Sequence, residues 1–167
     1  MENRLGQELR NIQNPALGGY LLSIFANEYY KHSGNFPPLQ LLFLVYPLLY
    51  IEELFTIITS TQKPTGLRGC MNKLKKNKIA KNDYLLYIHS SIKNNKWIIL
   101  SCIRLGMISG LISIDNDGAV IPLEVNQKRI KIKTKNIENM VKVAQKMGIW
   151  FSELSIAEIA QILKVRL

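Results

Sequence analysis

Residues 96–121 read KWIILSCIRLGMISGLISIDNDGAVI, and they decide the expected fold. Apolar side chains surround the first half of this stretch on most sides, which predicts a well-buried helix over residues 96–109. Two short β-type runs, 111–114 and 119–121, then flank Asp115-Asn116-Asp117-Gly118. The glycine of this segment permits the positive φ of a tight turn. We therefore expect a buried helix followed by a two-stranded hairpin.

Two further helices are expected just before this stretch. Thr65 is placed to cap the first, which carries Leu67, Cys70, Met71 and Leu74 on one face. Asn82 or Asp83 opens the second, with Leu85, Ile88 and Ile92 turned inward, and Lys93-Asn94-Asn95 forms the turn that follows it. Helices followed by a hairpin over residues 66–123 are typical of a winged helix-turn-helix. The same order also occurs in unrelated α+β domains.

Helices are also expected on both sides of this unit. Asn14-Pro15 begins one that ends near Ser33-Gly34, with Leu17, Leu21, Ile24, Phe25 and Tyr29 as a single apolar stripe. Another runs from Leu39 to Tyr46, where Pro47 ends or kinks it, and a short one covers residues 52–59. Downstream, Asn136 caps a long helix, and Ser155 with Glu158 forms a capping box for the last.

The predicted fold class is mainly α (α+β), a helical domain that contains a winged helix-turn-helix-like unit with a β-hairpin wing. We expect three parts. Residues 1–62 form an N-terminal helical segment, 63–135 the winged-helix-like unit with a basic strand, and 136–167 a C-terminal helical pair that packs on the rest.

Composition excludes several classes of protein. The 167 residues include two cysteines, too few for a disulfide framework, and two histidines, which leave little material for metal or acid–base chemistry. The most apolar run, residues 39–51, would span only ~20 Å as a helix, short of the ~30 Å of a bilayer core. The first ten residues lack the pattern of a secretory signal. We expect a cytoplasmic protein.

The sequence lacks the common catalytic and cofactor-binding motifs. The segment Gly66-Leu67-Arg68-Gly69 lacks the lysine and spacing of a phosphate-binding loop. Cys70 and Cys102 are too far apart in sequence for a zinc motif and fit buried free thiols. No acidic residue is placed to orient His89 as a base. We therefore expect no enzyme activity, no metal and no cofactor.

Basic residues gather in two places. Seven lie within residues 63–81, and five of the eight residues 128–135 are basic, alternating with Ile130, Ile132 and Thr134 as in a half-buried strand. Such runs are either solvated faces or sites that attract the phosphate backbone of nucleic acid without sequence specificity. The candidate contacts are Lys73, Lys75, Lys76, Lys78, Lys81, Lys128, Arg129, Lys131, Lys133 and Lys135. The expected recognition helix offers few polar groups for reading bases.

The chain resembles a known family over nearly its whole length. The residues that carry the likeness are Asn14-Pro15-Ala16-Leu17, the run 38–48, Thr65-Gly66-Leu67, the run 109–114, Lys146-Met147-Gly148-Ile149-Trp150-Phe151, and residues 155–165. They are similar to the middle component of three-component ABC ATPase systems, related to the small subunit of Lamassu-type anti-phage complexes. This chain departs from the family in its many lysines and its extended segment 124–135.

The resemblance implies a non-enzymatic adaptor in a hetero-oligomer. Its partners would be an SMC-like ABC ATPase and a nuclease-type effector, with double-stranded DNA as a further contact and no membrane. Aromatic residues are enriched at interfaces, so the candidate partner contacts are Tyr20, Tyr29, Tyr30, Phe36, Tyr46 and Tyr50. Each fits a place in the core equally well. The alternative is a stand-alone winged-helix transcriptional regulator.

Overall fold

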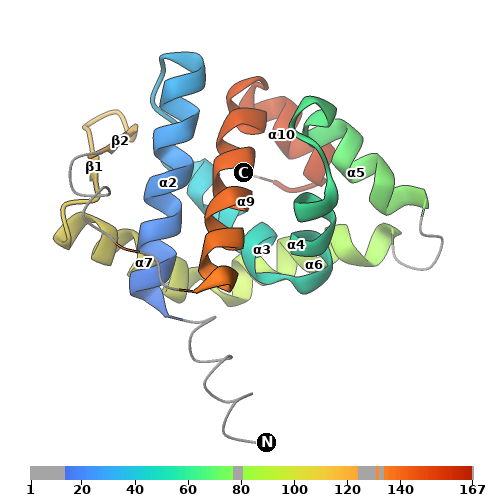
Figure 1. Ribbon diagram of the computed structural model, residues 1–167, viewed down its shortest axis with the longest axis horizontal. Helices are drawn as coiled ribbons and strands as arrows, with labels where there is room; N and C mark the ends of the chain where they lie inside the picture. The colour runs from blue at the N-terminus through green and yellow to red at the C-terminus, as the bar shows by residue number, and fades with distance from the viewer. Residues whose placement is uncertain (1–13, 77–80, 124–130, 132–133, 167) are drawn as a thin grey trace, which may run out of the picture.

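The computed structural model describes residues 14–76, 81–123, 131 and 134–166. Helices dominate this part of the chain, and one short hairpin interrupts them (Figure 1). The order of the elements is α2 (Pro15–Ser33), α3 (Leu39–Tyr50), α4 (Glu52–Ser60), the 3-10 turn η1 (Lys63–Thr65), α5 (Gly66–Lys76), α6 (Lys81–Asn94), α7 (Lys96–Ile108), β1 (Ile112–Ile114), β2 (Val120–Pro122), α9 (Lys135–Ser152) and α10 (Ile156–Leu163).

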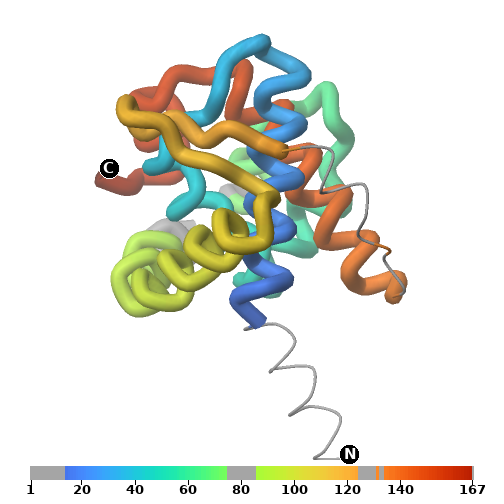
Figure 2. The backbone as a smooth tube through the Cα atoms, turned by 90° about the vertical axis from the view of Figure 1, so that its left-hand side faces the viewer, coloured from blue at the N-terminus to red at the C-terminus, as the bar shows by residue number. Residues whose placement is uncertain are grey.

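Helix α2 stands at the centre of the molecule, with α9 beside it and α7 crossing it (Figures 1 and 2). Glycines allow both close approaches. A Cβ on Gly19 would lie 2.6 Å from the carbonyl oxygen of Cys102 in α7. A Cβ on Gly148 in α9 would lie 2.7 Å from the carbonyl oxygen of Phe25 in α2. The bare backbone at these two positions lets the helices pack without a side chain between them.

Helix α2 is buried on all sides through its middle. All ten residues from Gly18 to Asn27 are buried, including the polar Ser23 and Asn27. A single apolar stripe was predicted, and that prediction is too narrow. Because α7, α9, α3 and β2 all contact α2, the helix has no solvent face over these turns.

Local capping signals set the helix ends as predicted. The Oδ1 of Asn14 accepts a hydrogen bond from the amide of Ala16 at 2.9 Å, and α2 ends at Gly34 with φ 72°. The capping box of Ser155 and Glu158 is present at the start of α10. Pro47 does not end α3, which continues to Tyr50. Proline lacks the amide that would donate to the carbonyl of Phe43 one turn earlier, and the helix continues for three residues beyond it.

The predicted hairpin is confirmed. Strands β1 and β2 are antiparallel, with Ile112 opposite Pro122. In the turn, the Oδ1 of Asp115 accepts hydrogen bonds from the amides of Asp117 and Ala119, and Gly118 has φ 79°. An isolated bridge between Pro38 and Ala119 ties the hairpin to the segment before α3. The helices α5 to α7 and this hairpin follow the predicted order, while their assignment as a winged-helix unit stays a prediction.

One hydrophobic core joins the described elements. It contains residues from each of the three predicted parts, for example Phe25, Ile99 and Phe151. The boundaries between those parts stay a prediction. Within the described residues, no single helix is both long and apolar enough to cross a membrane; α3 and α4 meet that test only together, and they are bent by 92°.

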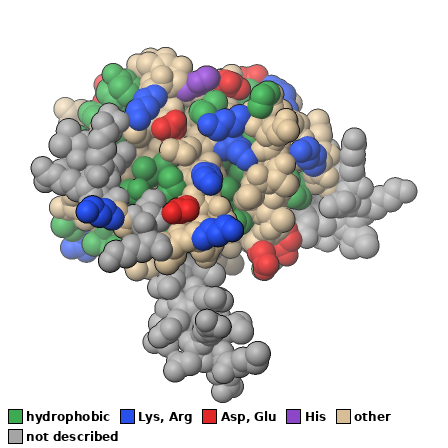
Figure 3. Space-filling view, viewed as in Figure 1, with side chains coloured by type: hydrophobic (Ala, Val, Ile, Leu, Met, Phe, Trp, Pro, Cys, Tyr) green, Lys and Arg blue, Asp and Glu red, His purple; other side chains and the backbone are tan. Residues whose placement is uncertain are grey.

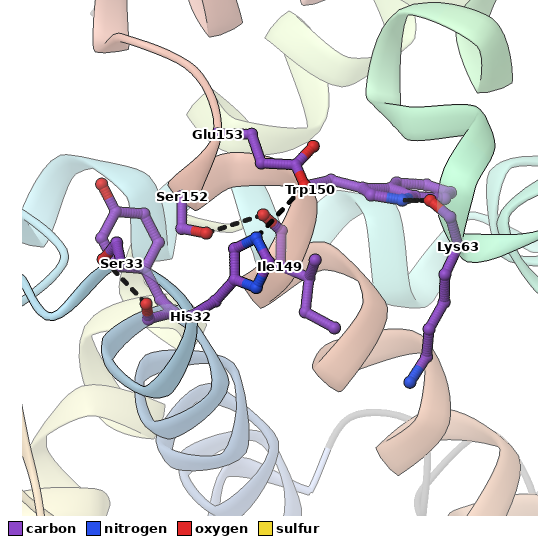
Figure 4. A network of polar contacts seen from close by, with 8 residues as sticks. His32, Ser33, Lys63, Ile149, Trp150, Ser152 and Glu153 are labelled. Atoms are coloured by element: carbon purple, nitrogen blue, oxygen red, sulfur yellow. Dashed lines mark hydrogen bonds and ion pairs between the residues drawn. The ribbon is translucent and has the colours of Figure 1, made fainter.

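A lysine from α9 caps the C-terminal end of α4. The Nζ of Lys146 donates hydrogen bonds to the carbonyl oxygens of Ile58, Thr59 and Thr61, at 2.7, 3.1 and 2.6 Å. A cation suits the negative end of a helix dipole. Burial lowers the pKa of Lys146, and the neighbouring Trp150 ring lies 5.8 Å from its Nζ. The Nε1 of Trp150 donates to the carbonyl oxygen of Lys63, as Figure 4 shows.

Candidate partner and nucleic-acid interfaces

The structure separates the predicted nucleic-acid contacts. Lys73 is exposed on α5, Lys75 and Lys76 fall in the last turn of that helix, and Lys81 begins α6. Lys131 and Lys135 are exposed. The remaining candidates, Lys78, Lys128, Arg129 and Lys133, lie outside the described residues.

The predicted basic strand over residues 128–135 is wrong for the residues that the structure describes. Lys131 and Thr134 are in neither a helix nor a strand, and Lys135 is the first residue of α9. The helix therefore begins one residue before the predicted cap, Asn136. Alternation of basic and β-branched residues favoured a strand, but the start of α9 takes the end of that run.

Basic and acidic side chains are mixed on the face that Figure 3 shows. Lysines and arginines (blue) are spread over this face, with acidic side chains (red) among them. Elsewhere in the described structure, basic and acidic side chains form ion pairs, such as Arg68 with Glu158 at 2.7 Å. The described part of this face thus offers no dense basic patch, and the predicted phosphate contacts stay a prediction.

Two of the six candidate aromatic residues form an exposed pair. The rings of Tyr30 and Phe36 are stacked with centroids 4.7 Å apart, and both side chains are exposed. They lie at the C-terminal end of α2. On the same turn His32 contacts Glu153, the residue that follows α9, at 3.2 Å between Nε2 and Oε1 (Figure 4).

The other four aromatic candidates lie deeper in the molecule. Tyr20 and Tyr46 are buried, and Tyr29 and Tyr50 are half-buried against the core. Burial raises the pKa of Tyr46 to about 12 and raises that of Tyr50 further. The hydroxyl of Tyr50 is buried without a hydrogen-bond partner. These side chains pack the fold, and as partner contacts they stay a prediction.

Several large apolar side chains are exposed where none was predicted to be. Helix α7 was expected to be well buried, and that expectation is wrong for its outer side: Trp97 is 79% exposed and Ile108 69%. Met107 is also exposed, as are Leu86 and Tyr87 on α6. Only the inner side of α7, with Ile99, Cys102, Ile103 and Gly106, is buried. Apolar residues on every side of a helix do not show which side faces the core.

Few groups in the described structure could perform chemistry. Cys70 and Cys102 are free and buried, as predicted. Burial raises the pKa of both thiols, that of Cys102 to about 11, so neither is an activated nucleophile at neutral pH. Among the residues described, no group of three or more His, Cys, Asp or Glu side chains could hold a metal ion.

One family matches the chain, and it does so over residues 2–167. Its description is "ABC-three component (ABC-3C) system Middle Component 3". The chain belongs to this family. No curated protein and no solved structure matches it.

Membership of the family means that this middle component works beside other subunits. A three-component system built on an ABC protein implies an ATPase among them. The chain therefore has an adaptor role in a multi-subunit assembly, and its exposed apolar surfaces are the places to look for subunit contacts. Two are described: the Tyr30–Phe36 pair and the outer side of α6 and α7.

Proposed function

We propose that this middle component is a non-catalytic adaptor that holds an SMC-like ABC ATPase together with a nuclease-type effector. The assembly would act in the cytoplasm against phages or plasmids, as the resemblance to Lamassu-type complexes implies. The observation that carries the proposal is the exposed apolar side of α6 and α7, in a chain that the middle-component family matches over residues 2–167. Large exposed apolar side chains gathered on one surface are typical of a protein interface.

A bridging subunit needs two separate contact surfaces, and two separate exposed apolar sites support the proposal. The Tyr30–Phe36 pair lies at the C-terminal end of α2. Helix α7 crosses α2 near its N-terminal end, at Gly18 and Gly19 (Figure 1). The 19-residue helix α2, which is about 28 Å long at 1.5 Å per residue, lies between the two surfaces. Two partners can therefore bind without competing for the same residues.

The first experiment is affinity purification of the chain at its native expression level, followed by mass spectrometry. An SMC-like ATPase in stoichiometric amount is the expected result, with the effector recovered beside it. A homodimer of this chain alone would overturn the adaptor proposal and favour the regulator below.

We extend the proposal to the phosphate backbone of DNA, through the basic segment that contains Lys131. The double variant Lys131→Glu with Lys133→Glu should weaken binding of DNA to the assembled complex and leave assembly intact, because reversed charges repel phosphate. Lys142→Glu with Lys164→Glu, on α9 and just after α10, is the matched control. Equal binding by both double variants would remove this part of the proposal.

The second candidate is a stand-alone winged-helix regulator, which the order of α6, α7 and the hairpin favours. The outer side of α7 argues against it, because Trp97 and Ile108 stand where a base-reading helix carries polar groups. This candidate predicts sequence-selective binding of duplex DNA by the purified chain. A ratio of specific to non-specific affinity near one at physiological salt would exclude it.

A further inference from the structure

The outer side of α6 and α7 carries a repeated pattern. In an α-helix eleven residues make about three turns, so residues eleven apart return to the same side. Large apolar side chains recur at this spacing, and each interval contains a serine and then a basic residue. We call this set the α6–α7 stripe: Leu86, Ser90, Lys93, Trp97, Ser101, Arg104 and Ile108, all of them exposed.

The two helices of the stripe follow one another along one edge of the molecule (Figures 1 and 2). Helix-type hydrogen bonds continue through the junction, from the amide of Asn95 to the carbonyl of Ser91 at 2.9 Å and from the amide of Ile99 to the carbonyl of Asn95 at 3.0 Å. Measured along the two helices, the stripe covers 22 residue steps, at most about 33 Å at 1.5 Å per residue, and it passes the break at Asn95, whose φ is −101° and ψ 11°. A partner that covers the whole stripe has to follow both helices across that break.

The stripe is held outward by the packing of α7. On the opposite side of that helix, Cys102 and Gly106 lie against Gly18 and Gly19 of α2 too closely for an added Cβ. Helix α7 therefore has no freedom to rotate Trp97 into the core. The packing of α7 on α2 therefore keeps Trp97 and Ile108 at the surface.

The charge of this region has one sign. Residues 84–114 contain no Asp or Glu, and their basic residues are Lys93, Lys96 and Arg104. Two of these stand on the stripe between its apolar residues, and Lys96 is next to Trp97. A partner that covers the stripe must therefore bring acidic groups as well as apolar ones.

We infer that the α6–α7 stripe binds an acidic amphipathic helix of the ATPase component. Apolar side chains three turns apart would meet Leu86, Trp97 and Ile108, and carboxylates between them would pair with Lys93 and Arg104. The small side chains of Ser90 and Ser101 let the partner backbone approach. This inference rests on the proposed adaptor function, since the ATPase is the partner that function requires.

Other occupants fit the stripe less well. A membrane-surface helix needs a broad continuous apolar face, whereas serine and basic residues interrupt this one at each turn. Nucleic acid offers phosphates for Lys93 and Arg104, but its backbone leaves Trp97 and Ile108 without apolar contacts. A protein helix satisfies both kinds of side chain.

The two tryptophans provide the test. Trp97 is 79% exposed and Trp150 1% exposed, and there is no third tryptophan in the sequence. The full chain, labelled with 5-fluorotryptophan, is titrated with the purified ATPase component of its own system and followed by ¹⁹F NMR. Trp97→Phe assigns the two signals. The Trp97 signal should shift and lose its sensitivity to D₂O, while the Trp150 signal keeps its position.

Affinity of the variants then locates the contact. Trp97→Asp with Ile108→Asp, and separately Lys93→Glu with Arg104→Glu, should each weaken ATPase binding roughly tenfold or more. Matched controls are Ile156→Asp, an exposed isoleucine on α10, and Lys142→Glu, an exposed lysine on α9; each should change affinity by less than about twofold. Thermal melting checks that every variant folds.

A photo-crosslinker at position 97 identifies the partner segment. The expected product is a helical segment of the ATPase rich in Asp and Glu. Unchanged affinity in both stripe variants, or a crosslink to a basic or non-helical segment, overturns the inference and leaves the adaptor proposal standing. A Trp97 signal moved by phosphatidylglycerol vesicles or duplex DNA, but not by the ATPase, also overturns it. Failure of the unmodified chain to bind the ATPase at all overturns the adaptor proposal itself.

Discussion

Helices α2 and α7 are both rich in apolar residues, yet they are used in opposite ways. Ten consecutive residues of α2 are buried on every side, even Ser23 and Asn27. Helix α7 buries only its inner side and presents Trp97 and Ile108 to solvent. The difference teaches that the elements around a helix, and not its own composition, decide whether an apolar side chain supports the fold or remains free for a partner.

The largest expected effect is the difference in stability between alanine variants of the buried Trp150 and the exposed Trp97. Trp150→Ala removes a fully buried ring and its hydrogen bond to Lys63, and we expect it to lower the free energy of unfolding by about 3–5 kcal/mol. Trp97→Ala should change it by less than about 0.5 kcal/mol. Urea unfolding followed by circular dichroism measures both. Equal losses in the two variants would mean that the outer side of α7 supports the isolated fold.

The next largest loss of stability is expected where a glycine lets two helices pack closely, as Gly148 of α9 does against α2. In Gly148→Ala the new Cβ would meet the carbonyl oxygen of Phe25 at 2.7 Å and the amide of Tyr29 at 2.9 Å. Because α2 must move away, we expect a loss of about 1–3 kcal/mol, although alanine favours the helix itself. Ala157→Gly, in an exposed turn of α10, measures the difference in helix propensity between alanine and glycine where no close helix contact is involved. A more stable Gly148→Ala variant would show that α2 and α9 are not in close contact.

Replacing Lys146 tests a buried polar contact between α9 and α4. In Lys146→Met the carbonyl oxygens of Ile58, Thr59 and Thr61 lose their shared donor, and we expect a loss of about 1–3 kcal/mol. Lys142→Met on the exposed side of α9 should cost less than about 0.5 kcal/mol. Thermal melting of the two variants gives the comparison, and equal melting temperatures would show that water replaces the ammonium without cost.

Alkaline pH should destabilise the fold through the inner side of α7. Burial raises the pKa of Cys102 from 9.0 to about 11, so the folded chain holds the thiol proton more tightly than the unfolded chain. Stability is therefore complete below pH 9 and falls between pH 9 and 11, by up to about 1.4 kcal/mol per pH unit. Cys70 contributes in the same direction. In Cys102→Ala the slope of stability against pH above 9 should be smaller, and an unchanged slope would contradict this assignment.

Local signals predicted most of the secondary structure. Asn14, Gly34 and the box of Ser155 with Glu158 act through their own backbone neighbours, so their effect is visible in a short window of sequence. The turn at Asp115 and Gly118 is equally local. Pro47 was predicted to end or kink α3; it does not end the helix, which continues to Tyr50.

The candidate interfaces were harder to predict because they depend on packing. Tyr20 and Tyr46 could not be told from surface aromatics until α9 and α7 were placed around them. The outer side of α7 was missed since its apolar residues occur all round the helix. One signal was present in the sequence: Leu86, Trp97 and Ile108 recur every eleven residues, with a serine and a basic residue in each interval.

The central place of α2 also bears on how the chain is made. Helix α2 is synthesised first among the described elements, but α7, β2 and α9 that enclose it follow about 80 to 120 residues later along the chain. Its ten core residues therefore lack their full cover until α9, which ends at Ser152, has left the ribosome, and contacts this distant in sequence form slowly. Folding of this middle component is consequently a late event in its synthesis, and a stalled nascent chain that ends before α9 should be cut by protease within α2.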